Sequence, residues 1–196
     1  MAEIKSTMDL VMERAARIGK ASSEDLQREE AQKKGMQATA EYLDGTVASL
    51  LESLEKVKKE MRQDTRKGMI ESLFRNIFLP RNEIQQERAE KAANGLLELA
   101  GGAGDVATIC RELQQIMTGF MQHRDELRGQ LEEQVRMQYE HILAQQGGMG
   151  AGSMKIDPTM QPKFQEEWTR IESELISRYT EALEQHKANL TQRLRL

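Results

Sequence analysis

The sequence predicts an all-α protein, an elongated bundle or hairpin of long amphipathic helices with coiled-coil character and no β-sheet. Apolar residues recur at helical spacing over long stretches of the chain. Only 4% of the residues are aromatic and three are prolines, which is unlike a β-sandwich or barrel with its many strands and turns. Hydrophobic residues make up 38% and charged residues 31% of the chain, a balance typical of helices that each bury one stripe.

Composition also excludes several classes of function. The net charge of −4 gives no global field that would attract nucleic acid, so we expect no nucleic-acid partner. Cys110 is the only cysteine, which excludes an intramolecular disulfide and a cysteine-based zinc site and indicates a small buried residue. No signal peptide opens the chain, and no apolar run approaches the ~18 residues of a membrane span. A cytoplasmic location is the expectation.

Residues 1–19 read as a short amphipathic helix that ends at Gly19. Its stripe consists of Met8, Val11, Met12, Ala15 and Ile18. Such a helix is marginal alone, so it either covers a neighbouring core or docks into the groove of a partner. We favour the first interpretation, because terminal helices more often complete a core.

A second helix is predicted from Ser22 or Ser23 to about Lys67, with a heptad seam along it. Asp44 and Gly45 predict a kink or break, and Gly35 weakens the helix because glycine costs about 1 kcal/mol relative to alanine. The intervals between the apolar positions alternate strictly between four and three residues. The seam consists of Met36, Ala40, Leu43, Val47, Leu50, Leu54, Val57 and Met61.

The densest apolar stretch is residues 68–80, which we interpret as a helix opened by Gly68 and closed by Pro80. This apolar hub is expected to form a core under the longer helices. Its predicted core residues are Ile70, Leu73, Phe74, Ile77 and Phe78. The alternative is a helix that lies on a membrane surface, since residues 64–81 carry four basic and two acidic residues. We favour the internal helix.

Two further helices follow the hub. Asn82 is expected to cap a helix from Glu83 to about Ala100 that buries Ile84, Ala92, Leu96 and Leu99, and residues 101–104 form a tight glycine turn. Residues 105–146 are the longest uninterrupted helix candidate. Its stripe consists of Val106, Ile109, Leu113, Ile116, Phe120, His123, Leu127, Leu131, Val135, Gln138 and Ile142.

These elements suggest a bundle over residues 1–146, a flexible Gly/Pro linker over residues 147–161 and a C-terminal helix over residues 162–196. The linker is long enough for the last helix to fold back on residues 105–146 or to reach a second chain. The stripe of this helix includes Phe164, Trp168, Ile171, Leu175 and Tyr179, and Trp168 is the expected anchor.

No catalytic, cofactor-binding or metal-binding residues are predicted. The residues three positions before His123, His141 and His186 are not glutamates, so the Glu-x-x-His pattern of di-iron bundles is absent. Phosphate-loop, nucleophile-elbow and dinucleotide motifs are also absent. We therefore expect a protein that is not an enzyme.

Three segments resemble a bacterial family of all-helical proteins of similar length and unknown function. They are the opening Glu3-Ile4-Lys5-Ser6, the stretch from Leu73 to Pro80, and Asp157-Pro158 with the later run from Arg178 to Glu184. The resemblance spans most of the chain and implies one unit of conserved length. It implies no activity, cofactor or site residue.

The expected function is that of a cytoplasmic, non-enzymatic scaffold or adaptor that acts through helix–helix association with itself or with other proteins, and a homo-oligomer is the expected state. Burial of the heptad seam and the C-terminal stripe against partner helices would drive it. The interface candidates are Leu43, Val47, Leu50, Leu54, Val57, Phe164, Trp168, Ile171, Leu175 and Tyr179. The alternative is a peripheral membrane protein that docks through residues 69–79. A metal-dependent helical enzyme is a third class, which stoichiometric metal in purified protein would support.

Overall fold

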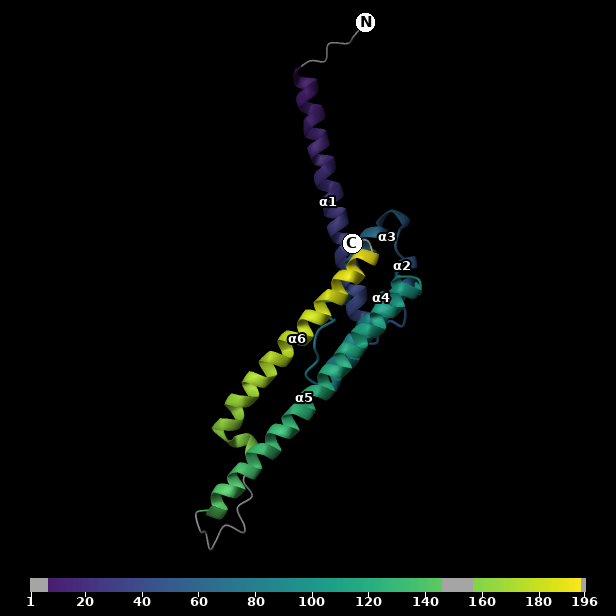
Figure 1. Cartoon of the computed structure of the whole chain (residues 1–196). Helices are drawn as coiled ribbons and strands as arrows, with labels where there is room; N and C mark the ends of the chain where they lie inside the picture. The colour runs from purple at the N-terminus through teal and green to yellow at the C-terminus, as the bar shows by residue number, and fades with distance from the viewer. Residues whose placement is uncertain (1–6, 146–156, 195–196) are drawn as a thin grey trace. The chain divides into compact units, whose positions relative to one another are not determined.

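The computed structural model describes residues 7–145 and 157–194, and all their regular elements are helical (Figure 1). Side chains are described for Met12, residues 23–142, Gln145 and residues 157–194. The elements are α1 (Thr7–Leu43), α2 (Leu50–Glu55), η1 (Lys59–Met61), α3 (Arg62–Arg75), α4 (Glu83–Leu99), α5 (Gly104–Gln145), η3 (Pro158–Met160) and α6 (Pro162–Leu194). The predicted all-α fold is confirmed over this part of the chain.

Contacts divide these elements into two units. The first unit contains α1, α2, η1, α3 and the part of α4 from Lys91 onward. The second contains the beginning of α4 up to Glu90, together with α5, η3 and α6. Contacts therefore group the chain differently from the predicted division at residues 147–161. Most of that predicted linker, residues 147–156, lies outside the described residues.

The first helix is longer than predicted. α1 runs without interruption for 37 residues, so the predicted end at Gly19 and new start at Ser22 or Ser23 are wrong. One glycine costs a helix only about 1 kcal/mol, which the neighbouring residues offset. The break predicted at Asp44-Gly45 is confirmed: α1 ends at Leu43, and Gly45 adopts a positive φ of 84° that favours glycine.

The continuous heptad seam predicted over residues 36–61 is wrong, because beyond Gly45 the chain folds into α2, η1 and α3. Ser49 begins α2 as its cap, and its hydroxyl accepts a hydrogen bond from the amide of Glu52 at 3.2 Å. The Glu98 carboxylate on α4 accepts hydrogen bonds from the Ser49 hydroxyl and from the Leu51 amide. These caps stabilise a short helix at a point where the apolar spacing alone predicts continuation.

The first unit is built on a close approach of α1 and α3. A Cβ added to Gly35 would overlap the carbonyl oxygen of Thr65 and lie 2.9 Å from the amide nitrogen of Met69. A Cβ added to Gly68 would lie 2.7 Å from the Cα of Gln32. Each helix thus uses a glycine where the backbone of the other passes. Gly35, predicted to weaken a helix, is required by this contact, and Gly68 lies inside α3 instead of opening it.

The apolar hub up to Ile77 packs inside the first unit. Ile70 and Leu73 are fully buried and Ile77 is 1% exposed, whereas Phe74 and Phe78 are only partly buried. The helix ends at Arg75 and not at Pro80, and the Asn76 side chain donates a hydrogen bond to the carbonyl of Ser72 at that end. Ile77 and Phe78 therefore follow the helix rather than belong to it.

α4 begins and ends as predicted. Asn82 caps its start by accepting a hydrogen bond from the amide of Gln85 at 2.9 Å. Ala92, Leu96 and Leu99 are buried, but Ile84 is 78% exposed, so its predicted inward position is wrong. Gly101 and Gly102 have positive φ angles of 67° and 71°, which confirms the glycine turn before α5.

The second unit is dominated by a helical hairpin, in which α5 and α6 pack side by side along most of α6 (Figure 1). The predicted bounds of both helices agree with the structure to within one residue where the chain is described. The buried stripe of α6 is formed by Phe164, Leu175, Leu183, Leu190 and Leu194. Two predicted stripe positions of α5 are exposed, His123 and Ile142.

Candidate functional site

The predicted interface residues are mostly occupied by contacts within the chain. Four of them, Leu43, Leu50, Phe164 and Leu175, have exposures of 7% or less, so they form core and not surface. The other six are partly buried: Val47, Leu54, Val57, Trp168, Ile171 and Tyr179. The reason is that the seam folds back within the first unit while α6 folds back on α5.

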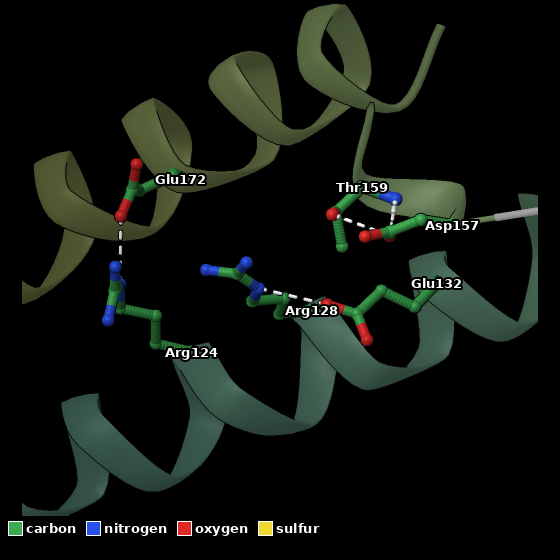
Figure 2. Close-up of polar contacts among 6 residues, drawn as sticks. All are labelled: Arg124, Arg128, Glu132, Asp157, Thr159 and Glu172. Atoms are coloured by element: carbon green, nitrogen blue, oxygen red, sulfur yellow. Dashed lines mark hydrogen bonds and ion pairs between the residues drawn. The ribbon is translucent and has the colours of Figure 1, made fainter. Parts of the chain in front are cut away.

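Trp168 illustrates this internal role. The guanidinium groups of Arg124 and Arg128 on α5 each lie 5.9 Å from the centre of its ring. Figure 2 shows Arg124 reaching across to Glu172 on α6, with 2.8 Å between Arg124 Nε and Glu172 Oε1. Arg128 pairs along its own helix with Glu132 at 3.0 Å (Figure 2). The indole is thus held by cation–π contacts and helps to fix α6 against α5.

A buried apolar cluster also joins α5 and α6. It consists of Leu131, Val135 and Phe164, and Tyr139, Trp168 and Ile171 pack against it. Towards the middle of α5, the Tyr179 ring meets the Phe120 ring edge-on, with 5.5 Å between their centres. These contacts account for the aromatic residues predicted along α6. They stabilise the hairpin.

A groove of about 470 Å³ lies between α5 and the beginning of α4 in the second unit. Gln86 donates hydrogen bonds to Glu90 and to the Thr118 hydroxyl at one wall. The groove is lined by Glu90, Arg111, Gln114, Gln115, Thr118, Gly119 and Gln122. Three of these seven residues are glutamines, and the lining contains neither a histidine nor a cysteine. Its one carboxylate, Glu90, accepts the hydrogen bond from Gln86.

Cys110 is buried, as predicted, at 3% exposure. Burial raises the pKa of its thiol to about 11, because the charged thiolate is poorly solvated there. Burial also raises the pKa of Tyr42, to which the nearby Glu98 carboxylate contributes. Neither group is activated as a nucleophile.

The described residues contain neither a metal-binding cluster nor a membrane-spanning helix. Among them, no group of three or more His, Cys, Asp or Glu side chains is placed to hold a metal ion. No helix in the described part of the chain is both long and apolar enough to cross a bilayer. The apolar side of residues 69–79 includes Ile70, Leu73 and Ile77, which are buried in the first unit. As arranged here, this segment does not present that side to a membrane.

The surface that stands out is the N-terminal part of α1. We call residues 7–30 the free segment. Of its side chains, those of Met12 and of residues 23–30 are described and all are exposed, whereas Ala31, the next residue, is buried. All side chains from residue 23 to residue 30 are exposed, and Leu26 is 63% exposed. Met12 is 66% exposed. In Figure 1 this part of α1, purple to blue, extends past α3.

The exposed side of the free segment faces away from α3. Leu26 and Gly35 are nine residues apart, which at 100° per residue places them on opposite sides of the helix. Met12 and Leu26 are two heptads apart and share one side. The two-heptad spacing is a signal that the sequence offers, yet Leu26 is not part of the predicted stripe.

Charged side chains surround Leu26 in pairs. Lys33 and Glu29 are 2.8 Å apart, Lys34 and Glu30 are 3.0 Å apart, and Arg28 lies 3.8 Å from Asp25. The hydrogen bond between Lys33 and Glu29, supported by their opposite charges, lowers the pKa of the Glu29 carboxyl and raises that of Lys33. Both shifts favour the charged forms of Glu29 and Lys33.

Comparison with known proteins places the chain in a family. Residues 51–192 match the model of a family described as a family of unknown function (DUF6657). The chain belongs to this family. No curated protein and no solved structure matches it. The resemblance to a family of unknown function is thereby confirmed, and the matched range covers α2 to almost the end of α6 while α1 lies before it.

Proposed function

We propose that the protein is a non-enzymatic scaffold or adaptor that associates with other helices through the free segment of α1. The observation that carries this proposal is the exposure of Leu26 and Met12, at 63% and 66%, on a helix whose described side chains are buried only from Ala31 onward. The association is with a protein helix, in the compartment expected for the chain, the cytoplasm.

Without a partner, a helix as long as the free segment has little to stabilise it. Its 24 or so residues span roughly 36 Å at 1.5 Å per residue. Helices in water draw most of their stability from packing an apolar side, and isolated helices gain little from propensity alone. A partner helix would supply that packing. Each Leu-sized or Met-sized side chain covered in this way contributes about 1.5–3 kcal/mol, so a few anchors give micromolar affinity after the cost of association.

This proposal keeps the predicted mode of action and relocates its surface. The heptad seam and the C-terminal stripe are engaged inside the two units, as Leu50 at 0% and Phe164 at 3% exposure illustrate. In the free segment two large apolar side chains, Met12 and Leu26, are exposed on one side of the same helix. It replaces the ten predicted residues as the interface candidate.

The first measurement is the molar mass in solution by light scattering across a dilution series. A stable multiple of 22.4 kDa supports self-association. A mass of 22.4 kDa throughout directs the search to a heterologous partner. That search uses a photo-reactive phenylalanine derivative in place of Leu26, introduced in cells that make the protein.

The matched control carries the same derivative in place of Glu174, an exposed residue of α6. We expect a discrete adduct from position 26 and none of the same mass from position 174. A monomer at every concentration, with no adduct specific to position 26, would overturn the proposal.

A further inference from the structure

We infer that the helix covering the free segment is α1 of a second copy of this chain, running antiparallel and centred near residue 22. This inference rests on the proposed function and names the partner that it leaves open. It is carried by the order of charges along α1, by the side on which Leu26 is exposed, and by the absence of α3 from that side.

Charges along α1 fall into four blocks of alternating sign. Residues 9–13 contain two acids, and residues 14–20 contain three bases. Residues 24–30 contain four acids and one arginine, and residues 33–34 are two lysines. The net charges of the blocks are therefore −2, +3, −3 and +2 in order. This order reverses in sign about residue 22.

An antiparallel pairing about residue 22 places residue i of one copy opposite residue 44 − i of the other. Residues 14–20 then lie opposite residues 24–30, and residues 9–13 lie opposite residues 31–35. Every block thus meets a block of opposite sign and equal size. A parallel pairing in register places each block opposite itself, which is repulsive throughout. Complementary charge suppresses the wrong arrangement and fixes the register.

The geometry of the first unit leaves room for this pairing. Lys33 follows Leu26 by seven residues and shares its side of α1, and the Lys33 and Lys34 side chains are 69% and 55% exposed. Ala31, Gly35 and Thr39 on the opposite side are buried. A second helix can therefore run along the Leu26 side as far as residue 35 without displacing α3.

Such an interface is isologous, so both copies use the same surface and the assembly closes as a dimer. It combines few apolar anchors with many charges. Salt shortens the screening length from about 10 Å at 0.1 M to about 3 Å at 1 M, so the dissociation constant should rise by about tenfold or more over that range. For an association driven mainly by apolar burial, the dissociation constant would instead stay the same or fall as salt is added.

Two single-cysteine additions distinguish the orientations. Ser23 and Met12 are both exposed. In the antiparallel dimer the two copies of position 23 lie about 3 Å apart along the helix axes, whereas the two copies of position 12 lie about 30 Å apart. Mild oxidation with diamide should therefore link Ser23→Cys into a covalent dimer and leave Met12→Cys monomeric on a denaturing gel.

The unsubstituted protein serves as the control, because its Cys110 is buried. A parallel dimer would link both variants, and that result would overturn the antiparallel assignment while leaving the proposed function in place. A monomer that gives an adduct of another mass from position 26 would do the same. Absence of both dimer and adduct would overturn the inference and the proposed function together.

Charge exchange tests the block pattern itself. The double variant Arg17→Glu/Lys20→Glu puts acids opposite residues 24–27, and the double variant Glu24→Lys/Asp25→Lys puts bases opposite residues 17–20. Each variant alone should dissociate at least tenfold more readily than the unsubstituted chain at low salt. Mixed in equal amounts, the two should form a heterodimer, because the exchanged blocks again meet with opposite signs. Failure of the mixture to associate, with both variants helical by circular dichroism, would contradict the charge register.

Discussion

The two units hold their main helix pairs together by opposite means. α1 and α3 meet backbone to backbone, with Gly35 against Thr65 and Met69, and Gly68 against Gln32. α5 and α6 meet through large side chains, such as Leu131 and Phe164. Both pairs make extensive contacts. Only the second keeps its backbones separated by a layer of side chains.

This difference determines which substitutions each helix pair tolerates. A side-chain layer can shift rotamers when one residue changes, so exchanges that conserve volume cost less than about 1.5 kcal/mol. Two backbones in contact have no rotamers to adjust. Thr39 reinforces the first contact, because its buried hydroxyl lies 3.0 Å from the Gly35 carbonyl and 3.4 Å from the Met69 carbonyl. The α1–α3 contact should therefore be intolerant of any added atom.

The largest expected effect follows from adding one methyl group to either glycine. Gly35→Ala and Gly68→Ala should each destabilise the first unit by about 3 kcal/mol or more, since an added Cβ must displace a neighbouring backbone. Hydrogen exchange followed by mass spectrometry should show faster exchange in peptides from α1 and α3. Peptides from α5 and α6 provide the internal reference.

Gly129→Ala is the matched control for these variants. Gly129 lies in α5 with nothing within 4 Å of an added Cβ, so alanine should stabilise that helix by about 0.5–1 kcal/mol. If Gly35→Ala were as harmless as Gly129→Ala, the close approach of α1 and α3 would be refuted. The contrast between the two units would then disappear.

The same difference explains what the sequence could and could not predict. The α5–α6 hairpin depends on large apolar residues at helical spacing, and that pattern is visible: Val106, Leu113, Phe120, Leu131 and Val135 are all buried. The α1–α3 contact depends on small residues, which do not appear in a pattern of large apolar side chains. Ala31, Gly35 and Thr39 lie four residues apart, and spacing alone does not separate such a contact from a weak point in a helix.

The candidate surface was missed for a related reason. Heptad spacing over residues 36–61 favoured one continuous seam, yet the break at Gly45 and the cap at Ser49 redirect the chain, and Ala40 is exposed. The proposed partner-binding role therefore moves from that seam to the free segment. Sequence supports the amphipathic character of the N-terminal helix. Only the position of α3 reveals which side of α1 remains open.

A smaller effect is expected from the ion pair between Arg124 on α5 and Glu172 on α6. Arg124 and Glu172 are 19% and 29% exposed, so their ion pair is less screened than a fully exposed one. A double-mutant cycle with Arg124→Met and Glu172→Gln should give a coupling free energy of roughly 1 kcal/mol in urea unfolding followed by Trp168 fluorescence. Trp168 is the only tryptophan and lies beside this pair.

The Glu167–Arg170 pair on α6 is the control for that cycle, because its side chains are 42% and 68% exposed and lie on one helix. Its coupling should be no more than about 0.5 kcal/mol. Equal coupling free energies for the two pairs would show that an ion pair between α5 and α6 stabilises the protein no more than one within α6. The hairpin would then depend on its apolar layer alone.

The smallest expected effect is a pH response at η3, the short helix that precedes α6. The Thr159 hydroxyl and amide both donate to Asp157 Oδ1, at 2.7 and 2.9 Å, and these bonds lower the pKa of the Asp157 carboxyl (Figure 2). A lowered pKa means that the Asp157 carboxylate stabilises the folded turn at pH values above the ordinary pKa of aspartate. This stabilisation is lost as the pH falls through the pKa of Asp157 in the folded protein.

The Thr159 amide resonance should therefore shift with pH, with a midpoint below that of an ordinary aspartate. Asp157→Asn, which still accepts a hydrogen bond but does not titrate, should abolish the shift. A midpoint at the ordinary value would contradict the contact.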